Sequence, residues 1–124
     1  MLSDTEAVAT IAVRDLQEAR RFYEKLGFKA RGNNEMGTAM FESGNSKFLV
    51  YQSQFAGTNK ATAATWAVAD VDKEVTALRA KGIEFEHYDF PGMKREGDVH
   101  VGGGIRNAWF KDPDGNILSV VSRR

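Results

Sequence analysis

The feature that most constrains the fold of this chain is an internal repeat with an offset of 55 residues. Asp15 and Gly27 enclose a segment with one apolar helical face, and Asp70 and Gly82 enclose a second such segment. Aspartate favours a helix start because its carboxylate accepts hydrogen bonds from the free amides of the first turn. Glycine favours a helix end because it adopts the left-handed conformation easily. The repeat therefore predicts one helix in each of two similar units.

Strand candidates surround both predicted helices in the same order, with one before the helix and three after it. In the first half they are residues 7–13, 28–31, 38–42 and 47–52, with turns at Asn33–Asn34 and Ser43–Ser46. In the second half they are residues 65–69, 84–88, 106–111 and 117–122, and residues 53–61 form the linker. We therefore expect an α+β fold with two tandem βαβββ units, 1–54 and 55–124, in a single domain spanning 1–124.

The turn before the last strand candidate has the sequence Asp-Pro-Asp-Gly and begins at Asp112. Proline suits the second position of a type I turn, and glycine suits a left-handed residue that closes it. A three-residue loop would pair Asp112 with Asn116 and set Trp109 opposite Ser119. A two-residue loop would exchange the faces of Trp109 and Phe110, so both registers stay open.

A long segment, residues 90–104, contains five glycines and several charged residues. It is either a mobile surface connection or a lid that folds over a ligand. Its glycines lack the spacing of a phosphate-binding loop, so the sequence predicts no nucleotide site.

The composition excludes several classes of site. The chain has no cysteine, which rules out disulfides, thiolate metal sites and cysteine nucleophiles. Its 17 basic and 17 acidic residues balance, so we expect no general attraction to nucleic acid or to anionic membranes. No apolar run is long enough to span a membrane, and the N-terminus has no signal-peptide pattern. A cytoplasmic protein is expected.

Three motifs resemble the vicinal oxygen chelate superfamily, which includes glyoxalase I, bleomycin-resistance proteins and extradiol dioxygenases. They are Asp15-Leu16 before the first helix, the segment FYEKLGF at 22–28, and the ending WFKDPDGN at 109–116. The resemblance implies curved, cup-like mixed sheets that enclose a ligand, with the helices on the outer face. In members with a metal, four side chains inside the cup hold a divalent ion that polarises two neighbouring oxygens of the substrate.

The resemblance also implies where those four ligands would lie. The corresponding residues here are Val8, Val50, Ala63 and Ser119, with the second position uncertain by one residue. Hydrocarbon side chains and one hydroxyl do not bind a divalent cation. We therefore expect a metal-free member without a cofactor. His87 and His100 lie outside these positions and are interpreted as solvent-facing or structural.

Strand alternation indicates which side chains face the cup. The predicted ligand-binding residues are Thr10, Met40, Val50, Gln52, Thr65, Asn107, Trp109 and Ser119. They form a mostly apolar surface with an aromatic wall, which suits a planar or aromatic ligand held by burial and stacking. Alternatively, these side chains pack in a dimer interface or a collapsed core.

Three functions are consistent with these features. The leading hypothesis is metal-independent capture of a small aromatic molecule by a homodimer, as in antibiotic-sequestering members. The second is an enzyme of the lyase, dioxygenase or isomerase type, using either a relocated metal or Glu42 as the acid or base. The third is a domain whose cup serves only for dimerisation.

Overall fold

The first unit contains a mixed four-stranded sheet and one helix. The computed structural model describes residues 1–32 and 37–123, so the turn predicted at Asn33–Asn34 lies outside the described residues. The strands pair in the order β1-β4-β3-β2, with β1 and β4 parallel and the other pairs antiparallel. After a short 3-10 turn at Leu2–Asp4, the elements are β1 (Ala9–Val13), α1 (Leu16–Lys25), β2 (Lys29–Arg31), β3 (Thr38–Ser43) and β4 (Ser46–Gln52).

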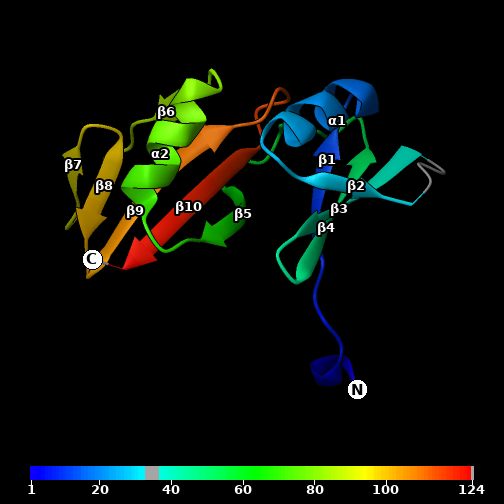
Figure 1. The fold of residues 1–124 in the computed structure, drawn as a ribbon, viewed down its shortest axis with the longest axis horizontal. Coiled ribbons are helices and arrows are strands. Elements are labelled where there is room, and N and C mark those ends of the chain that lie inside the picture. Colours follow the sequence, from blue (N-terminus) through cyan, green and yellow to red (C-terminus); the bar gives the residue numbers. More distant parts are fainter. Residues whose placement is uncertain (33–36, 124) are drawn as a thin grey trace.

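The second unit repeats this arrangement and adds two strands. Its sheet has the order β5-β10-β9-β8-β7, and β6 also pairs with β9. The strands β5 and β10 are parallel, and the remaining pairs are antiparallel. The elements are β5 (Thr62–Ala67), α2 (Val71–Ala80), β6 (Phe85–Glu86), β7 (Lys94–Glu96), β8 (Val99–Gly102), β9 (Ile105–Lys111) and β10 (Ile117–Arg123). Figure 1 shows the two sheets next to one another, which confirms the predicted α+β fold with mixed sheets.

Both helices begin and end where the repeat predicts. A carboxylate oxygen of Asp15 accepts a hydrogen bond from the Gln17 amide at 3.0 Å, and one of Asp70 accepts from the Lys73 amide at 3.2 Å. The glycine after each helix has a positive φ, 104° in α1 and 87° in α2. Local hydrogen bonding and glycine geometry thus set the helix limits.

One contiguous apolar core lies between the helices and the sheets. Ile11, Val13, Phe110 and Leu118 are at most 2% exposed within it, as the strand alternation predicts. Trp66 packs on the same core from β5, and its indole N–H donates to the Ser43 hydroxyl of the first unit. The helices contribute Ala19 and Tyr23 from α1 and Val71, Val75 and Leu78 from α2.

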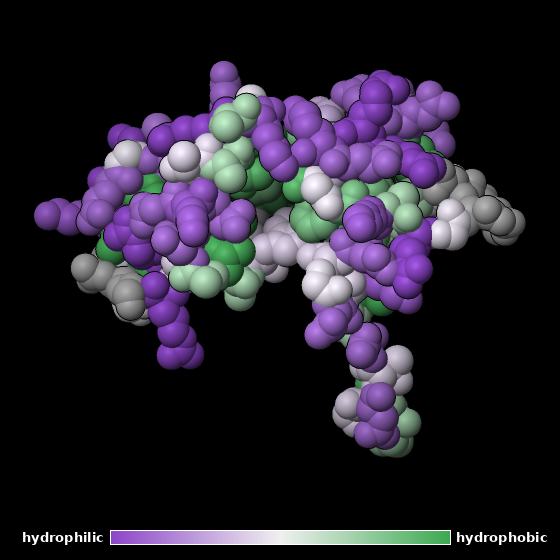
Figure 2. Space-filling view, viewed as in Figure 1, coloured by the Kyte–Doolittle hydropathy of each residue, from purple (hydrophilic) through white to green (hydrophobic). Residues whose placement is uncertain are grey.

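A cavity of about 200 Å³ remains between the two units on this side of the sheets. Figure 2 shows hydrophobic side chains in the hollow between the units, under a mostly hydrophilic surface. The cavity is lined by Leu26, Phe28, Trp66, Val68, Glu74, Leu78, Phe110 and Val120.

Residues 90–104 form a β-hairpin in their middle part, where the sequence predicted an irregular segment. Whether the segment is a mobile connection or a lid stays a prediction. The strands β7 and β8 pair with each other, and β8 pairs with β9. Val99 and Val101 are buried in the core. Gly97, Gly103 and Gly104 have positive φ angles of 63°, 60° and 79° at the two hairpin turns. These glycines therefore make tight turns between paired strands.

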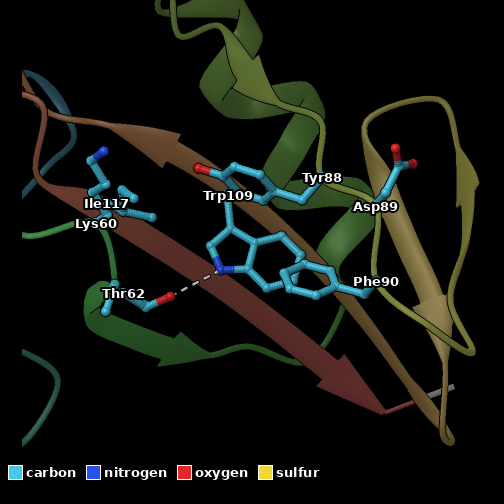
Figure 3. A pocket seen from close by; sticks show the side chains of 8 residues that line it. Lys60, Thr62, Tyr88, Asp89, Phe90, Trp109 and Ile117 are labelled. Atoms are coloured by element: carbon cyan, nitrogen blue, oxygen red, sulfur yellow. Dashed lines mark hydrogen bonds between the residues drawn. The ribbon is translucent and has the colours of Figure 1, made fainter.

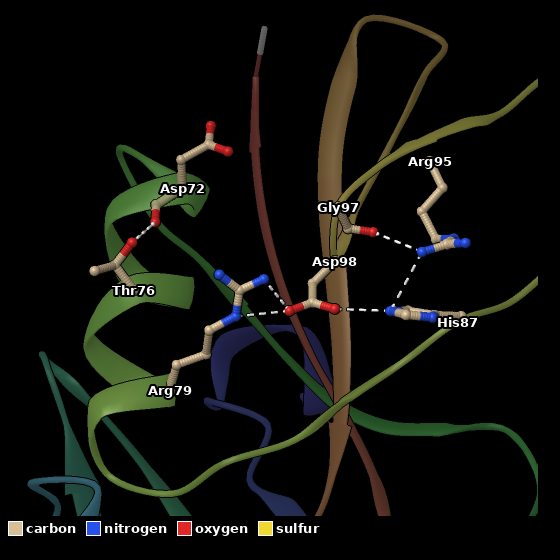
Figure 4. Close-up of polar contacts among 7 residues, drawn as sticks. All are labelled: Asp72, Thr76, Arg79, His87, Arg95, Gly97 and Asp98. Carbon is tan, nitrogen blue, oxygen red and sulfur yellow. Dashed lines mark hydrogen bonds and ion pairs between the residues drawn. The ribbon is translucent and has the colours of Figure 1, made fainter.

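The turn between β7 and β8 is tied to α2 by Asp98 (Figure 4). One oxygen of this carboxylate accepts hydrogen bonds from the Arg79 guanidinium, with Nε at 2.7 Å, and the other lies 2.7 Å from Nε2 of His87. Burial raises the pKa of Asp98, but the hydrogen bonds from His87 and Arg79 outweigh it, and the net pKa lies below 3.8. Asp98 therefore stabilises the hairpin as an anion.

The linker between the units packs against the last turn. Gly57 has a φ of 72°, and a Cβ atom at this residue would lie 1.9 Å from the Asp114 carbonyl oxygen. Only glycine allows this approach. In the turn itself, the Asp112 amide donates to the Asn116 carbonyl oxygen at 3.0 Å. This is the three-residue register of the two that the sequence allowed.

Within the described ranges, no helix has both the length and the apolar character needed to cross a bilayer.

Candidate ligand-binding site

The site is a pocket on the face of the second sheet that points away from the core, called here the cup face. Trp109 pairs with Ser119 across β9 and β10, whereas its neighbours Ala108 and Phe110 lie in the core. The pocket has a volume of about 600 Å³, within the range of small-molecule sites. It is lined by Lys60, Ala61, Thr62, Tyr88, Asp89, Phe90, Trp109 and Ile117 (Figure 3).

Tyr88, Phe90 and Trp109 form the wall of this pocket, and the buried His100 packs against Trp109 from outside the pocket lining; these four rings are called here the aromatic cluster. Around the indole, the ring centroid of Phe90 lies at 5.2 Å, that of Tyr88 at 5.6 Å and that of His100 at 4.9 Å. The indole N–H donates to the Thr62 hydroxyl at 3.2 Å, which holds the ring in place. Such a wall binds flat apolar molecules by burial and by edge or face contacts between rings.

Three predicted polar residues meet beside the cluster. The Ser119 hydroxyl is buried and donates to the side-chain oxygen of Asn107 at 2.8 Å. Thr65 is exposed and pairs with Ser119 from the neighbouring strand. The structure therefore brings together four of the eight predicted binding residues on the cup face of the second sheet, with Trp109 as the fourth.

Val50 does not face the cup, and this prediction is wrong. It pairs with Ile11 on β1 and with Ala39 on β3, and all three side chains are at most 1% exposed in the core. Successive residues of a strand point to opposite faces, so a shift of one residue exchanges them. Leu49 therefore takes the cup face of β4, opposite Met40.

Gln52 has the same parity as Val50 and is also wrongly placed by the prediction. It is exposed in a shallow hollow with Arg14, Ser53 and Gln54, away from the aromatic cluster. Val50 and Gln52 belong to the same face of β4, so the one-residue shift in the predicted alternation misplaces both.

Thr10 and Met40 lie on the cup face of the first sheet. Thr10 is exposed, donates to the Val8 carbonyl oxygen at 3.3 Å, and borders a small cavity of about 120 Å³. Met40 is half-buried across the sheet, where it pairs with Leu49. Neither residue lines the pocket over Trp109.

The residues at the superfamily's metal positions do not fit a divalent ion. Val8, Ala63 and Ser119 remain the residues at the first, third and fourth metal positions. Because Val50 faces the core, the second position falls on its neighbour Leu49 or Tyr51. Neutral hydroxyls are the most that this set offers, whereas divalent ions bind carboxylate, imidazole or thiolate donors. Among the described residues, no group of three or more histidines, cysteines, aspartates or glutamates forms an alternative site. Freedom from metal stays a prediction.

Glu42 lies on the first sheet and forms a salt bridge with Arg31. Its carboxylate is 34% exposed, and it does not line the pocket over Trp109. Glu42 is therefore paired with a guanidinium outside the pocket, and the structure places no reacting group beside it.

The sequence predicted Trp109 as a binding residue but not Tyr88, Phe90 or His100. Tyr88 and Phe90 follow the short strand β6, and His100 lies on β8 with 1% exposure. The alternation Val99-His100-Val101 was an available signal, because two core valines around one residue direct that residue to the cup face. His87 is exposed and paired with Asp98.

Burial changes the acidity of one pocket hydroxyl. It raises the pKa of Tyr88 above 10.0, Glu86 raises it further, and Lys111 opposes both. The phenol therefore keeps its proton at neutral pH and is available as a hydrogen-bond donor and acceptor.

The chain thus consists of two mixed-sheet units with a pocket on the cup face of the second sheet. The sequence profile of the Glyoxalase/Bleomycin resistance protein/Dioxygenase superfamily matches residues 7–120, and the chain belongs to this superfamily. No curated protein matches the chain in sequence.

Solved structures with the same fold include two that concern bleomycin. A bleomycin-binding protein in complex with bleomycin is 18% identical with a TM-score of 0.73, covering 97% of this chain and 99% of its own. A bleomycin resistance determinant from transposon Tn5 is 18% identical with a TM-score of 0.72, covering 97% and 98%. A fosfomycin resistance protein from Mesorhizobium loti is 14% identical with a TM-score of 0.68, covering 98% and 93%. At these identities the likeness shows a shared fold.

Proposed function

We propose that the chain captures a planar aromatic molecule in the pocket over Trp109, without a metal ion and without chemical change. The observation that carries this proposal is the wall of three rings, Tyr88, Phe90 and Trp109, in a pocket of about 600 Å³. Burying a flat ring there removes apolar surface from water and adds ring contacts of roughly 0.5–1.5 kcal/mol each. Capture requires only a shaped pocket, which the described residues supply.

The donor chemistry supports capture over catalysis. The metal positions carry hydrocarbon or neutral hydroxyl groups, and Glu42 is paired with Arg31 outside the pocket. The shared fold with proteins named for binding or resisting bleomycin makes an antibiotic or an aromatic metabolite the first ligand class to examine.

The test is a titration of aromatic metabolites and antibiotics, bleomycin included, followed by tryptophan fluorescence. The two tryptophans lie on opposite faces, since Trp66 packs on the core and Trp109 lines the pocket. In the Trp66→Phe variant the signal reports Trp109 alone, and a ligand should change it saturably. The Trp109→Phe variant is the matched control and should give no such change. A ligand set that leaves Trp109 unchanged, together with a product found by mass spectrometry, would replace capture by catalysis.

We also propose that the protein works as a homodimer. Val8, Tyr51 and Phe55 are 44%, 37% and 68% exposed around the cup face of the first sheet. Apolar side chains gathered on one face favour association with a second copy. Light scattering after gel filtration should give twice the monomer mass. A monomer that still binds its ligand would remove the dimer from the proposal.

The cytoplasmic location and the lack of nucleic-acid partners stay predictions from the sequence.

A further inference from the structure

His100 is the most buried polar side chain of the aromatic cluster. It is 1% exposed, and its ring centroid lies 4.9 Å from that of Trp109. Its strand neighbours Val99 and Val101 point into the core, so the imidazole lies on the cup face. A polar ring in this position needs hydrogen-bond partners, because an unsatisfied buried polar atom is costly.

The hydrogen bond from Tyr88 fixes the tautomer of this ring. The backbone N–H of Tyr88 donates to Nε2 of His100 at 2.9 Å. A backbone amide can only donate, so Nε2 supplies its lone pair and carries no hydrogen. A neutral imidazole has one N–H, which must then be on Nδ1.

The Nδ1–H group has no partner. Nδ1 of His100 is fully buried and makes no hydrogen bond with any described group, and the same is true of the Tyr88 hydroxyl. Both groups are donors at neutral pH, since burial raises the pKa of the phenol. The aromatic cluster thus holds two unused donors, the Nδ1–H group and the phenol O–H, and the phenol oxygen is also an unused acceptor.

Phe90 covers His100 on the side of the pocket. Its ring lies 6.2 Å from the imidazole and 5.2 Å from the indole, and it is 42% exposed. Phe90 belongs to a turn without regular secondary structure. A hydrogen bond from the Met93 amide to the Phe90 carbonyl oxygen closes this turn. A ligand ring in the place of the Phe90 ring would contact both Trp109 and His100.

We infer that the pocket selects aromatic molecules that carry an acceptor oxygen next to the ring, such as an aryl carbonyl, and that His100 Nδ1–H binds this oxygen after the Phe90 side chain moves aside. Lys60 and Asp89 also line the pocket and have opposite charges. The inference rests on the proposed capture function and names the ligand class of the same pocket. His100 is a specificity-determining residue in this account.

The first measurement concerns the free protein. A long-range proton–nitrogen spectrum of the histidine rings distinguishes a protonated Nδ1 from a protonated Nε2. We expect His100 to show the proton on Nδ1. A proton on Nε2 would overturn the inference before any ligand is added, and would leave the proposed function untouched.

The second measurement compares acetophenone with ethylbenzene, which has nearly the same shape but no acceptor oxygen. Both are titrated while the indole N–H resonance of Trp109 is followed. We expect acetophenone to bind about 5- to 10-fold more tightly, the effect of one added buried hydrogen bond. The His100 Nδ1–H resonance should shift with acetophenone alone.

Two variants separate the donor from the ring. In His100→Gln the side-chain oxygen can still accept from the Tyr88 amide, but its N–H₂ group is displaced from the Nδ1 position, and the preference for acetophenone should fall to about onefold. In His100→Asn an amide group remains near the Nδ1 position, so part of the preference should remain. Where a variant fails to fold by circular dichroism, the two measurements on the wild-type protein decide.

The outcomes distinguish the two proposals. Equal binding of both probes with a response at Trp109 would overturn the role of His100 and leave aromatic capture standing. No response at Trp109 to either probe would overturn both. An acetophenone preference that persists in His100→Gln would show that another donor, such as the Tyr88 hydroxyl, binds the oxygen, and the inference about His100 would fall.

Discussion

The hydroxyl of Tyr23 donates a hydrogen bond of 2.9 Å to the Asp112 carboxylate, and so joins α1 of the first unit to the last turn of the second. The same carboxylate accepts from the backbone amides of Asp114 and Asn116 and from the Asn116 side chain. Burial raises the pKa of Asp112, and burial and the Asp112 charge raise that of Tyr23. This buried network is one of the contacts that hold the two units together, beside the shared core.

The first prediction concerns that link. Tyr23→Phe removes one of the donors to a buried carboxylate and should lower the free energy of unfolding by about 1–3 kcal/mol. Urea denaturation followed by circular dichroism measures the change. Tyr51→Phe is the matched control, because Tyr51 is 37% exposed, and its change should stay within about 0.5 kcal/mol. Equal effects of the two variants would contradict the structural role of Tyr23.

The second prediction concerns pH and Asp98. Its pKa is lowered in the folded protein, so the folded state releases this proton more readily than the unfolded state. The resulting stabilisation is fully present above the usual pKa of 3.8 and is lost as the pH falls through the lower folded value. Asp98→Asn should therefore cost about 1 kcal/mol at pH 7 and progressively less below pH 4.

Thermal melts of wild type and Asp98→Asn across this pH range measure the difference. Asp4→Asn is the control, since Asp4 is 79% exposed at the N-terminus, and its difference should be small at every pH. A constant difference between wild type and Asp98→Asn from pH 7 to pH 3 would contradict the ionic link between the β7–β8 hairpin and α2.

The third prediction concerns the linker. Gly57→Ala places a methyl group against the Asp114 carbonyl oxygen in a backbone conformation with positive φ. The strain and the clash should cost roughly 1–3 kcal/mol. Gly44→Ala provides the comparison: Gly44 also has a positive φ, 57°, but nothing lies within 4 Å of its added Cβ. The larger loss on chemical denaturation should belong to Gly57→Ala.

The fourth prediction separates the two tryptophans in binding. With any ligand found by titration, Trp109→Leu should lower the affinity about tenfold or more, because the indole forms the wall of the pocket. Trp66→Leu should leave the affinity within about twofold, although it lowers stability through its core contacts. Isothermal titration calorimetry gives both values. A greater loss of affinity from Trp66→Leu would place the ligand in the cavity on the helix side instead.

The fifth prediction concerns metals. Ligand affinity should be the same before and after dialysis against EDTA, and added zinc, nickel, manganese or iron should not raise it, because the family's metal positions lack suitable donors. Elemental analysis of the purified protein accompanies the titration. One equivalent of a transition metal that is needed for binding would overturn metal-free capture and restore an enzymatic function.

The sequence by itself determined the features that depend on neighbouring residues. The caps at Asp15 and Asp70 and the glycines that follow both helices are local, because a side chain and an amide two or three residues apart settle them. The superfamily could also be identified from the sequence, since its motifs are short and continuous. The final turn was reduced to two registers by its residue types.

The tertiary structure decided the rest. Whether Val50 or Leu49 faces the cup depends on the pairing of β4 with strands distant in sequence, and a shift of one residue reverses the answer. Likewise His100 belongs to the aromatic cluster because the pairing of β8 with β9 places its imidazole beside Trp109. Helix ends are decided within one turn of chain, whereas the two walls of a pocket meet only through long-range strand pairing, which local sequence does not specify.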